Sequence, residues 1–234
     1  MKIALFGYGK MGKVIEKIAV ERGHEIVLKI EQGDASYNLK IADVAIDFST
    51  PTAAVSNITE AINCQIPVVC GTTGWLEAFE SIKSLCHTKN GAFLYASNFS
   101  LGMNLFFELN RKLAQVMKPY GEYSMGIEEI HHTQKQDAPS GTAITLAEDA
   151  IKESEYTGWS LGKSLDPKQI GIEAKRIENI PGTHSVSYDS KIESIEIKHI
   201  AKNREGFGLG AVIAAEWLFG KTGVFSMKDV LNIK

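Results

Sequence analysis

The sequence contains few of the features that mark secreted, membrane-bound or nucleic-acid-binding proteins. Among its 234 residues are only three cysteines, Cys64, Cys70 and Cys86, an odd number without CxxC spacing. A disulfide framework or a zinc site is therefore not expected. No apolar run approaches the roughly 20 residues needed to span a bilayer, and the first apolar stretch is too short for a signal peptide. The sequence has no internal repeats and no low-complexity tracts. We expect a protein of the reducing cytoplasm.

The charge of the chain also excludes whole classes of partner. A formal net charge of -3 provides no bulk attraction to nucleic acid or to an anionic membrane. Local basic sites for a small anion remain possible. The hydrophobic fraction of 44% is that of an ordinary globular protein. At 234 residues the chain is long enough for one large domain or two small ones.

A glycine-rich turn joins the first predicted strand to the first predicted helix. Residues 2–6 have the pattern of a buried strand and residues 11–20 that of an amphipathic helix, and GYGKMG lies between them at 7–12. The GxGxxG spacing is weak evidence alone, but here it has the strand and helix that dinucleotide binding requires. We predict a doubly wound dinucleotide-binding domain with cofactor contacts from Gly7, Tyr8, Gly9, Lys10 and Met11.

An acidic residue ends the second predicted strand. Residues 25–30 form that strand, and Glu31 follows them, 24 positions after Gly7. An acid at this place hydrogen-bonds the ribose hydroxyls of a bound dinucleotide. A solvated turn residue is the alternative, and the glycine motif upstream favours the ribose role.

The most informative segment is HHTQKQDAPSGTA, residues 131–143. The preceding residues 123–130 predict a strand, so both histidines can share one site only if the strand ends or bends there. Residues 143–152 predict a helix with Ser140 or Thr142 as N-cap. The unpaired N–H groups of a helix N-terminus suit a carboxylate or phosphate. With two imidazoles and Lys135 upstream, the segment is typical of a site that holds an anion and moves protons.

Metal binding is the other functional interpretation of adjacent histidines. No nearby cysteine and no suitably spaced histidine completes a ligand set around His131 and His132 in the sequence. We therefore predict no metal site.

This segment closely resembles the HHxxKxDAPSGTA signature of dihydrodipicolinate reductase, the nicotinamide-dependent reductase of lysine and diaminopimelate biosynthesis. The resemblance implies that His131 is the general acid/base, that Lys135 donates a proton and attracts a dianionic substrate, and that His132 contacts the substrate. It further implies that the backbone of Gly141 and Thr142 holds one carboxylate of a cyclic dicarboxylate, 4-hydroxy-tetrahydrodipicolinate.

The resemblance extends over essentially the whole chain. GTTG at 71–74 and SNFSLGMN at 97–104, each following a predicted strand, are similar to the family's cofactor segments. The resemblance thereby adds further cofactor contacts: Gly71, Thr72, Thr73, Ala96, Ser97, Asn98 and Phe99. Asn98 is equally suited to capping the helix that follows. PGTH at 181–184 and HIAKNR at 199–204 resemble two more family segments, whose histidines, His184 and His199, we interpret as structural.

The family also implies an architecture. Residues 1–102 and 205–234 form the Rossmann-type domain, and residues 103–204 form an inserted α+β domain for substrate binding and oligomerisation within a homotetramer. Period-two alternation in 173–176, 185–188 and 192–200 indicates strands of an open sheet in that insertion.

The cofactor is expected to be NADH or NADPH, with NADH used at least as well. In the family an arginine commonly follows the ribose-binding acid and meets the 2′-phosphate of NADP. Here that position is Gln32, and Lys10 is the cation that could partly replace the missing charge.

Two other functions fit part of the sequence. Another nicotinamide-dependent oxidoreductase acting on a small dicarboxylate, such as a semialdehyde dehydrogenase, needs a nucleophilic cysteine in an activating turn, and none of the three has such a context. A non-catalytic NAD(H)-sensing regulator retains the glycine turn but has no need for the histidine–lysine segment.

Overall fold

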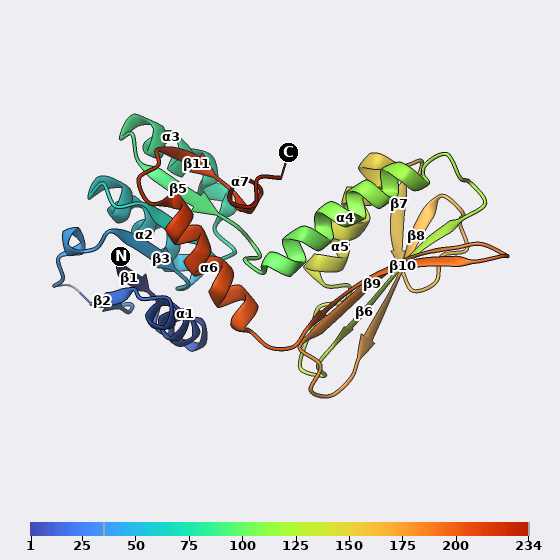
Figure 1. Cartoon of the computed structure of the whole chain (residues 1–234), viewed down its shortest axis with the longest axis horizontal. Helices are drawn as coiled ribbons and strands as arrows, with labels where there is room; N and C mark the ends of the chain where they lie inside the picture. Colours follow the sequence, from blue (N-terminus) through green and yellow to red (C-terminus); the bar gives the residue numbers. More distant parts are fainter. Residues whose placement is uncertain (35, 234) are drawn as a thin grey trace. The chain divides into compact units, whose positions relative to one another are not determined.

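The computed structural model describes residues 1–34 and 36–233 and divides the chain into two units. Met1–Leu101 and Arg204–Lys234 form unit 1, and Gly102–Asn203 form unit 2 (Figure 1). Each boundary lies one residue from the domain limit expected from the sequence. None of the described helices is long and apolar enough to cross a membrane.

Unit 1 is built on a six-stranded sheet in the order β11-β5-β4-β3-β1-β2. Every neighbouring pair is parallel. The strands are β1 (Lys2–Phe6), β2 (Glu25–Ile30), β3 (Val44–Asp47), β4 (Val68–Cys70), β5 (Ala92–Tyr95) and β11 (Gly223–Phe225). The chain leaves β1 for β2 on one side and then returns to β3 on the other, so the strand order reverses between β1 and β3.

Helices cover both faces of this sheet (Figure 1). Ile3 and Leu5 of β1 pack with α1 and α6, while Ala4 and Phe6 pack with α2 and α3, because successive strand side chains point to opposite faces. Both faces are therefore apolar, as a doubly wound sheet requires. The helical elements of unit 1 are α1 (Lys10–Glu21), η1 (Leu39–Ile41), α2 (Pro51–Asn63), η2 (Leu76–Ala78), α3 (Phe79–Thr88), α6 (Glu205–Leu218) and α7 (Met227–Val230).

Unit 2 contains a five-stranded mixed sheet in the order β10-β9-β6-β8-β7. Its strands are β6 (Ser124–His131), β7 (Gly158–Leu161), β8 (Gln169–Arg176), β9 (Gly182–Asp189) and β10 (Ser194–Ala201). Two helices, α4 (Leu101–Met117) and α5 (Gly141–Glu153), pack on one face, where Met125 and Ile127 of β6 enter the core. The predicted fold class, a doubly wound α/β domain with an inserted α+β domain, is confirmed.

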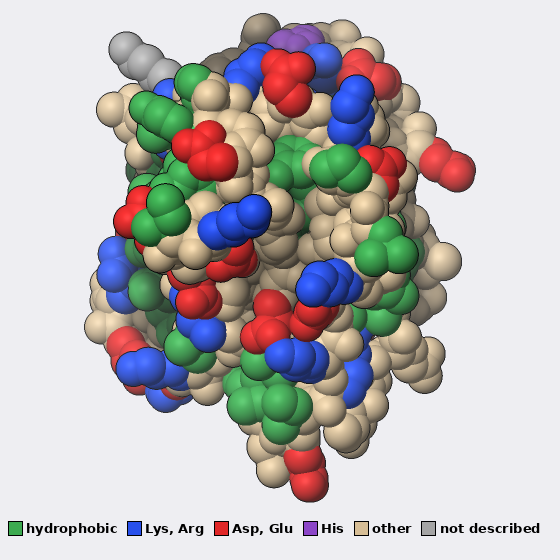
Figure 2. Space-filling model, turned by 90° about the vertical axis from the view of Figure 1, so that its right-hand side faces the viewer, with side chains coloured by type: hydrophobic (Ala, Val, Ile, Leu, Met, Phe, Trp, Pro, Cys, Tyr) green, Lys and Arg blue, Asp and Glu red, His purple; other side chains and the backbone are tan. Residues whose placement is uncertain are grey.

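Charged side chains of both signs alternate across the face drawn in Figure 2. This distribution agrees with the small net charge of the chain, -3. The surface drawn there accordingly presents mixed charge to the solvent.

Candidate active site

The glycine turn lies where the strand order of the first sheet reverses. Gly7 has φ +87, and a Cβ there would lie 2.4 Å from the carbonyl oxygen of Phe48. A Cβ on Gly12 would lie 2.4 Å from the carbonyl oxygen of Gly7. Both positions therefore require glycine, one for backbone conformation and close approach, the other for packing of α1 against the turn. A Cβ on Gly9, in contrast, would meet no heavy atom within 4 Å.

A cavity of about 310 Å³ opens at this turn. Gly9 is the N-cap of α1 and provides no side chain to bond the first N–H groups of the helix, so those groups suit an anion. These features fit the pyrophosphate and ribose of a dinucleotide. The cavity is lined by Gly7, Tyr8, Gly9, Ile30, Glu31, Gln32, Phe48, Ser49, Thr50, Ala53 and Asn57.

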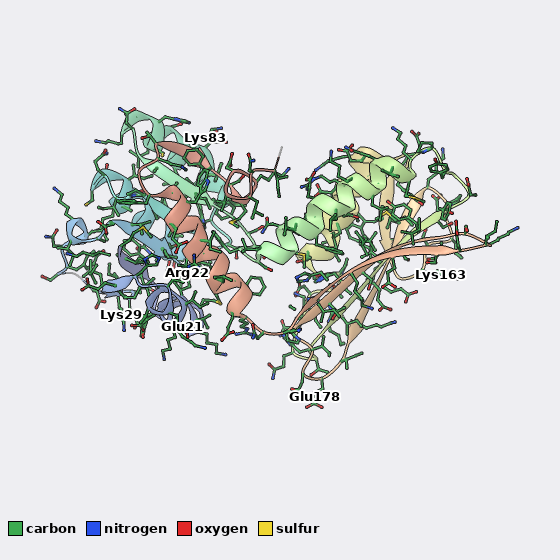
Figure 3. All side chains as sticks on the ribbon, in the orientation of Figure 1. Glu21, Arg22, Lys29, Lys83, Lys163 and Glu178 are labelled. Atoms are coloured by element: carbon green, nitrogen blue, oxygen red, sulfur yellow. The ribbon has the colours of Figure 1, made fainter. Side chains whose placement is uncertain are left out.

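One cation near this cavity is already paired. Lys29, labelled in Figure 3, has its ammonium 4.3 Å from the ring centroid of Tyr8 and 2.7 Å from the carboxylate of Glu16. Tyr8 also donates a hydrogen bond to Glu16. The Glu16 carboxylate thus offsets the charge that Lys29 brings close to Tyr8, a residue that lines the cavity. Neither Lys29 nor Glu16 belongs to a motif that is recognisable in the sequence.

A buried carboxylate organises the turns after β3 and β4. Asp47 is fully buried and accepts hydrogen bonds from the hydroxyls of Ser49 at 2.6 Å and Thr72 at 2.8 Å, and from the amide of Asn57 at 2.9 Å. The Thr72 hydroxyl also accepts the N–H of Ser49 at 2.9 Å. The side chain of Thr72 is therefore occupied within the protein, and the exposed Thr73 beside it has the more accessible hydroxyl.

The remaining predicted cofactor residues follow two parallel strands. Gly71, Thr72 and Thr73 follow β4, and Ala96 to Phe99 follow β5, so both segments begin at the carboxyl edge of the sheet. The ring of Phe99 is 2% exposed and packs against Phe48 at 5.6 Å between centroids. Phe99 is therefore almost fully buried as a residue, and little of it is left to face a ligand. The Asn98 side chain accepts the N–H of Ser100 at 2.9 Å just before α4 begins.

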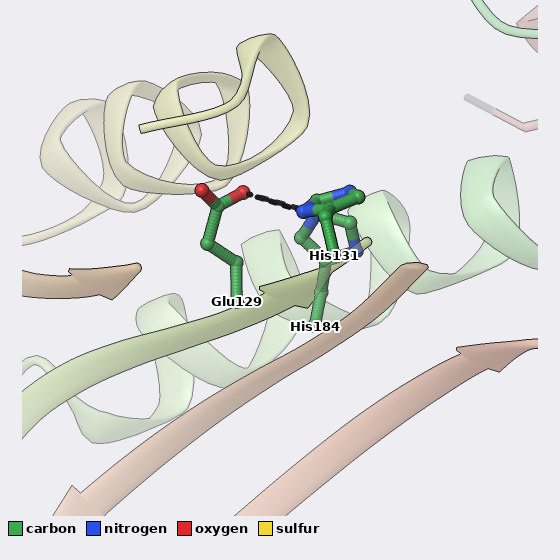
Figure 4. Close-up of side chains that lie close together, drawn as sticks. All are labelled: Glu129, His131 and His184. Atoms are coloured by element: carbon green, nitrogen blue, oxygen red, sulfur yellow. Dashed lines mark ion pairs between the residues drawn. The ribbon is translucent and has the colours of Figure 1, made fainter. Parts of the chain in front are cut away.

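In unit 2, strand β6 carries two titratable side chains on its buried face. Burial alternates along the strand, so Glu129 and His131 follow Met125 and Ile127 on the face that the helices cover. Glu129 is 0% exposed and His131 is 8% exposed. Glu129 Oε2 lies 3.3 Å from His131 Nδ1, as the dashed line in Figure 4 indicates. β6 ends at His131, and His132 comes after the strand.

The other carboxylate oxygen of Glu129 is held by two donors. Oε1 accepts the backbone N–H of Ser140 at 3.0 Å and lies 3.2 Å from the guanidinium of Arg176. Burial raises the pKa of the Glu129 carboxyl, but the interactions with His131 and Ser140 outweigh it and lower the pKa to about 2. Glu129 is therefore ionised at neutral pH.

His184 completes this cluster from the neighbouring strand β9. In the antiparallel pairing of β6 and β9, His184 lies opposite Glu129. Its Nε2 is 3.8 Å from Glu129 Oε2, and its ring centroid is 5.0 Å from that of His131. Its Nε2 is also 3.3 Å from the hydroxyl of Ser140. Burial, followed by the charge of His131, lowers the pKa of His184 to about 4, so its imidazole is neutral at pH 7.

The loop with Lys135 is anchored by Arg176. The Arg176 guanidinium donates to the carbonyls of Lys135 at 3.2 Å and Asp137 at 2.5 Å. Lys135 forms an ion pair with Asp137 through two contacts of 2.8 Å. The Ala138–Pro139 peptide bond in this loop is cis. Arg176 therefore links the lysine loop to Glu129, and so to the histidine cluster.

The loop leads into α5, whose N-terminus adjoins the same cluster. Ser140 is its N-cap, and the hydroxyl accepts the N–H of Ala143 at 3.2 Å. Of the two N-caps the sequence allowed, Ser140 is thus the one used. The next residues, Gly141 and Thr142, form the first turn, whose N–H groups have no acceptor inside a helix. A Cβ on Gly141 would meet nothing within 4 Å, so this end of the helix is accessible.

Three donor atoms of the cluster are spaced closely enough to hold a metal ion. One atom each from Glu129, His131 and His184 lies within 4.8 Å of the other two. The sequence did not reveal this set, because Glu129 and His131 lie on β6 and His184 comes from β9. Arg176 and Lys135 bring positive charge to the same region, which opposes cation binding.

Two protein-family models together match almost the whole chain. Residues 1–99 match the family described as dihydrodipicolinate reductase, N-terminus, and residues 102–231 match the one described as dihydrodipicolinate reductase, C-terminus. The chain belongs to the dihydrodipicolinate reductase family.

Individual members of the family are similar over nearly the full length. A protein of Christiangramia forsetii named 4-hydroxy-tetrahydrodipicolinate reductase is 54% identical, with 99% of this chain and 98% of that protein covered. One of the same name from Methanosarcina barkeri is 36% identical over 97% of this chain and 83% of its own length. The solved structure of dipicolinate-bound dihydrodipicolinate reductase from Paenisporosarcina sp. TG-14 shares the fold with a TM-score of 0.79, 22% identity and 98% coverage of both chains.

Proposed function

We propose that this protein reduces 4-hydroxy-tetrahydrodipicolinate to tetrahydrodipicolinate with a nicotinamide cofactor, in lysine and diaminopimelate biosynthesis. The observation that carries the proposal is the junction of three features within unit 2: the buried His131, the loop of Lys135, and the N-terminus of α5. Glu129 and Arg176 tie all three together. The three features provide a proton donor, a cation and an anion-binding helix end. The reduction of a cyclic dicarboxylate needs all three.

In this proposal each residue has a separate role. His131 is the general acid, a task worth about 10²–10⁴ in rate. Lys135 attracts the dianion and assists proton transfer, and the substrate takes the place of Asp137 as its partner. The backbone N–H groups of Gly141 and Thr142 bind one carboxylate, and His132, at the end of the strand, contacts the substrate.

The cavity at the glycine turn is where unit 1 holds the dinucleotide. The N–H groups at the start of α1 bind the pyrophosphate, and Glu31 accepts from the ribose hydroxyls. The segments after β4 and β5, from Gly71 and from Ala96, extend the cofactor-binding edge. When bound, the nicotinamide supplies the hydride, and the protein orients it.

A mechanism through a cysteine nucleophile has less support. Cys70 and Cys86 are buried, and burial raises the pKa of both thiols, which keeps them protonated and unreactive. A semialdehyde dehydrogenase needs an activated thiolate instead.

One assay tests the proposal. Enzymatically generated 4-hydroxy-tetrahydrodipicolinate is added with NADH or NADPH, and oxidation of the cofactor is followed at the nicotinamide absorbance. We expect substrate-dependent oxidation with both cofactors. No oxidation with either would overturn the proposed function.

We further propose that the protein acts in the cytoplasm as a homotetramer assembled through the sheet of unit 2. The face of that sheet opposite α4 and α5 carries small and polar side chains, including those of Ser124, Ser185 and Ser187, which line an open groove. Light scattering at micromolar concentration should give four times the chain mass of 25.6 kDa. A monomer would contradict the assembly without affecting the active-site assignment.

A further inference from the structure

We propose that Glu129 is a positioning residue that fixes the tautomer of His131, and that Gly182 keeps space free beside the reactive nitrogen of that imidazole. This inference rests on the proposed role of His131 as general acid. Neither Glu129 nor Gly182 belongs to the histidine–lysine segment recognised in the sequence.

The two carboxylate oxygens of Glu129 differ in their hydrogen-bond partners. Oε1 is occupied by the Ser140 N–H and the Arg176 guanidinium. Oε2 has no hydrogen-bond partner among the described residues, although it is fully buried, and the same holds for His131 Nδ1. The two atoms face each other at 3.3 Å (Figure 4). A buried ionised oxygen needs a donor, and His131 Nδ1 is nearer to it than His184 Nε2, which is 3.8 Å away.

The proton on His131 therefore belongs on Nδ1. In a neutral imidazole one nitrogen carries the proton and the other a lone pair. With Nδ1–H directed at Glu129, Nε2 is left to take up and release the catalytic proton. The carboxylate also stabilises the imidazolium that forms when Nε2 is protonated, and apo contacts of this kind commonly shorten in the complex.

The space around His131 Nε2 depends on Gly182. A Cβ added to Gly182 would lie 3.2 Å from His131 Nε2 and 3.4 Å from its Cδ2. Gly182 is not among the glycines with positive φ, so its backbone does not require glycine. The absence of a side chain at this position instead leaves room beside the ring. Any larger residue would press on the nitrogen that, in this assignment, exchanges the proton.

A metal ion is the rival explanation of the cluster, and it makes the opposite prediction about the proton. The donor set of Glu129, His131 and His184 would use a lone pair on His131 Nδ1, because this is the nitrogen that faces the carboxylate. The tautomer of His131 therefore distinguishes the two.

The tautomer can be measured without any assay of activity. Protein labelled with ¹⁵N-histidine is studied by long-range ¹H–¹⁵N NMR above pH 7, and the His131 signals are assigned from their loss in His131→Asn. We expect a protonated Nδ1 and an unprotonated Nε2. An Nε2–H tautomer would overturn the inference, and a shift of the His131 and His184 signals on addition of stoichiometric Zn²⁺ to that form would favour the metal instead.

The kinetic test compares two neighbouring carboxylates on β6. Glu129→Gln keeps the shape of the side chain and removes its charge, whereas Glu128→Gln changes the adjacent residue, whose side chain pairs with Lys175 at the surface. We expect Glu129→Gln to lower kcat about 10²-fold, with KM and the NADH dissociation constant within twofold of wild type, and Glu128→Gln to retain full kcat. Equal kcat in both variants would overturn the role of Glu129.

Gly182→Ala provides a test that does not change charge. We expect about a tenfold loss of kcat, because the added methyl group would crowd His131 Nε2, while the NADH dissociation constant stays unchanged. Normal kcat in this variant would refute the role of Gly182. If Glu129→Gln lacks the near-ultraviolet circular dichroism of the wild type, the NMR measurement and Gly182→Ala still decide. A wild-type protein without reductase activity would contradict the proposed function, whereas the NMR measurement would still test the tautomer of His131.

Discussion

The hydroxyl of Thr72 donates a 2.8 Å hydrogen bond to the buried carboxylate of Asp47, and this bond joins the turns that follow β4 and β3. Ser49 and Asn57 bind the same carboxylate from the β3 side. Ser49 and Asn57 also line the cavity proposed for the cofactor. One acidic side chain therefore fixes the positions of two turns at the carboxyl edge of the sheet relative to each other.

Replacement of Asp47 should consequently weaken cofactor binding. Asp47→Asn places an amide donor among donors, so at least one of the surrounding groups loses its acceptor, at a cost of about 1–3 kcal/mol in unfolding free energy. We expect a rise of about tenfold in the NADH dissociation constant, which corresponds to about 1.4 kcal/mol. Fluorescence titration and urea unfolding measure the two effects. Asp43→Asn, at the other end of β3, is the control, and an unchanged NADH affinity in Asp47→Asn would refute the argument.

Substitutions in the histidine–lysine segment should separate catalysis from cofactor binding. His131→Ala removes the proton donor and leaves unit 1 unaltered, so kcat should fall by about 10²–10⁴ while the NADH dissociation constant stays the same. Lys135→Ala should lower kcat and also raise KM, because the attraction to a dianion is lost. Lys175→Ala removes a surface ammonium of the same sheet and serves as control. Near-wild-type kcat/KM in both site variants would show that the active site lies elsewhere.

The local motifs of unit 1 were predictable because their function and their backbone conformation coincide. GYGKMG needs a tight turn between a strand and a helix, and the residues on either side have the matching periodicities. β7 and β11 were not predicted, since four and three residues are too short to establish an alternating pattern. β11 follows Gly220 and adds to the edge of the sheet by pairing with β5, a contact between segments far apart in the chain.

The candidate site was only half predictable for a similar reason. Alternation along β6 places Glu129 on the same face as His131, so the sequence contained a signal for that acid. His184 and Arg176 enter through the register of β6 with β9 and β8, where Glu129 is opposite His184 and His131 is opposite Arg176. Such register depends on tertiary pairing, which a single sequence does not reveal. For this reason the sequence did not place His184, which we interpreted as structural, in the cluster.

The buried imidazole of His184 predicts a loss of stability in mild acid. Its pKa is about 4 in the folded protein, against 6.5 for an unperturbed histidine. Between these values the unfolded chain binds the proton and the folded chain does not, so lowering the pH favours unfolding. The contribution to the unfolding free energy is complete above pH 6.5 and falls by about 2 kcal/mol between pH 7.5 and 5.

Urea unfolding at these two pH values, at one protein concentration, measures this effect. In His184→Gln the difference in unfolding free energy between pH 7.5 and pH 5 should shrink by about 2 kcal/mol, even though the variant is less stable overall. His87→Gln, which changes an exposed histidine in the last turn of α3, should retain the wild-type difference. An equal pH dependence in wild type and His184→Gln would show that His184 does not cause it.

The choice between NADH and NADPH should depend on Gln32, which lines the cavity beside Glu31. A 2′-phosphate carries nearly two negative charges and is best bound by a guanidinium through paired hydrogen bonds. Gln32 has no charge, and Glu31 repels a phosphate while suiting a free hydroxyl. Lys29 is offset by Glu16 at 2.7 Å, and Lys10 is an exposed point charge on a flexible stem.

We therefore expect the wild-type protein to use NADH at least as well as NADPH. Gln32→Arg should shift the ratio of kcat/KM values towards NADPH, whereas Gln32→Met, of similar length and without charge, should not. Steady-state kinetics with both cofactors in all three proteins provide the comparison. A wild-type preference for NADPH of tenfold or more, about 1.4 kcal/mol, would mean that Lys10 or Lys29 binds the phosphate. Glu16→Gln, which frees Lys29, would then identify which of the two lysines is responsible.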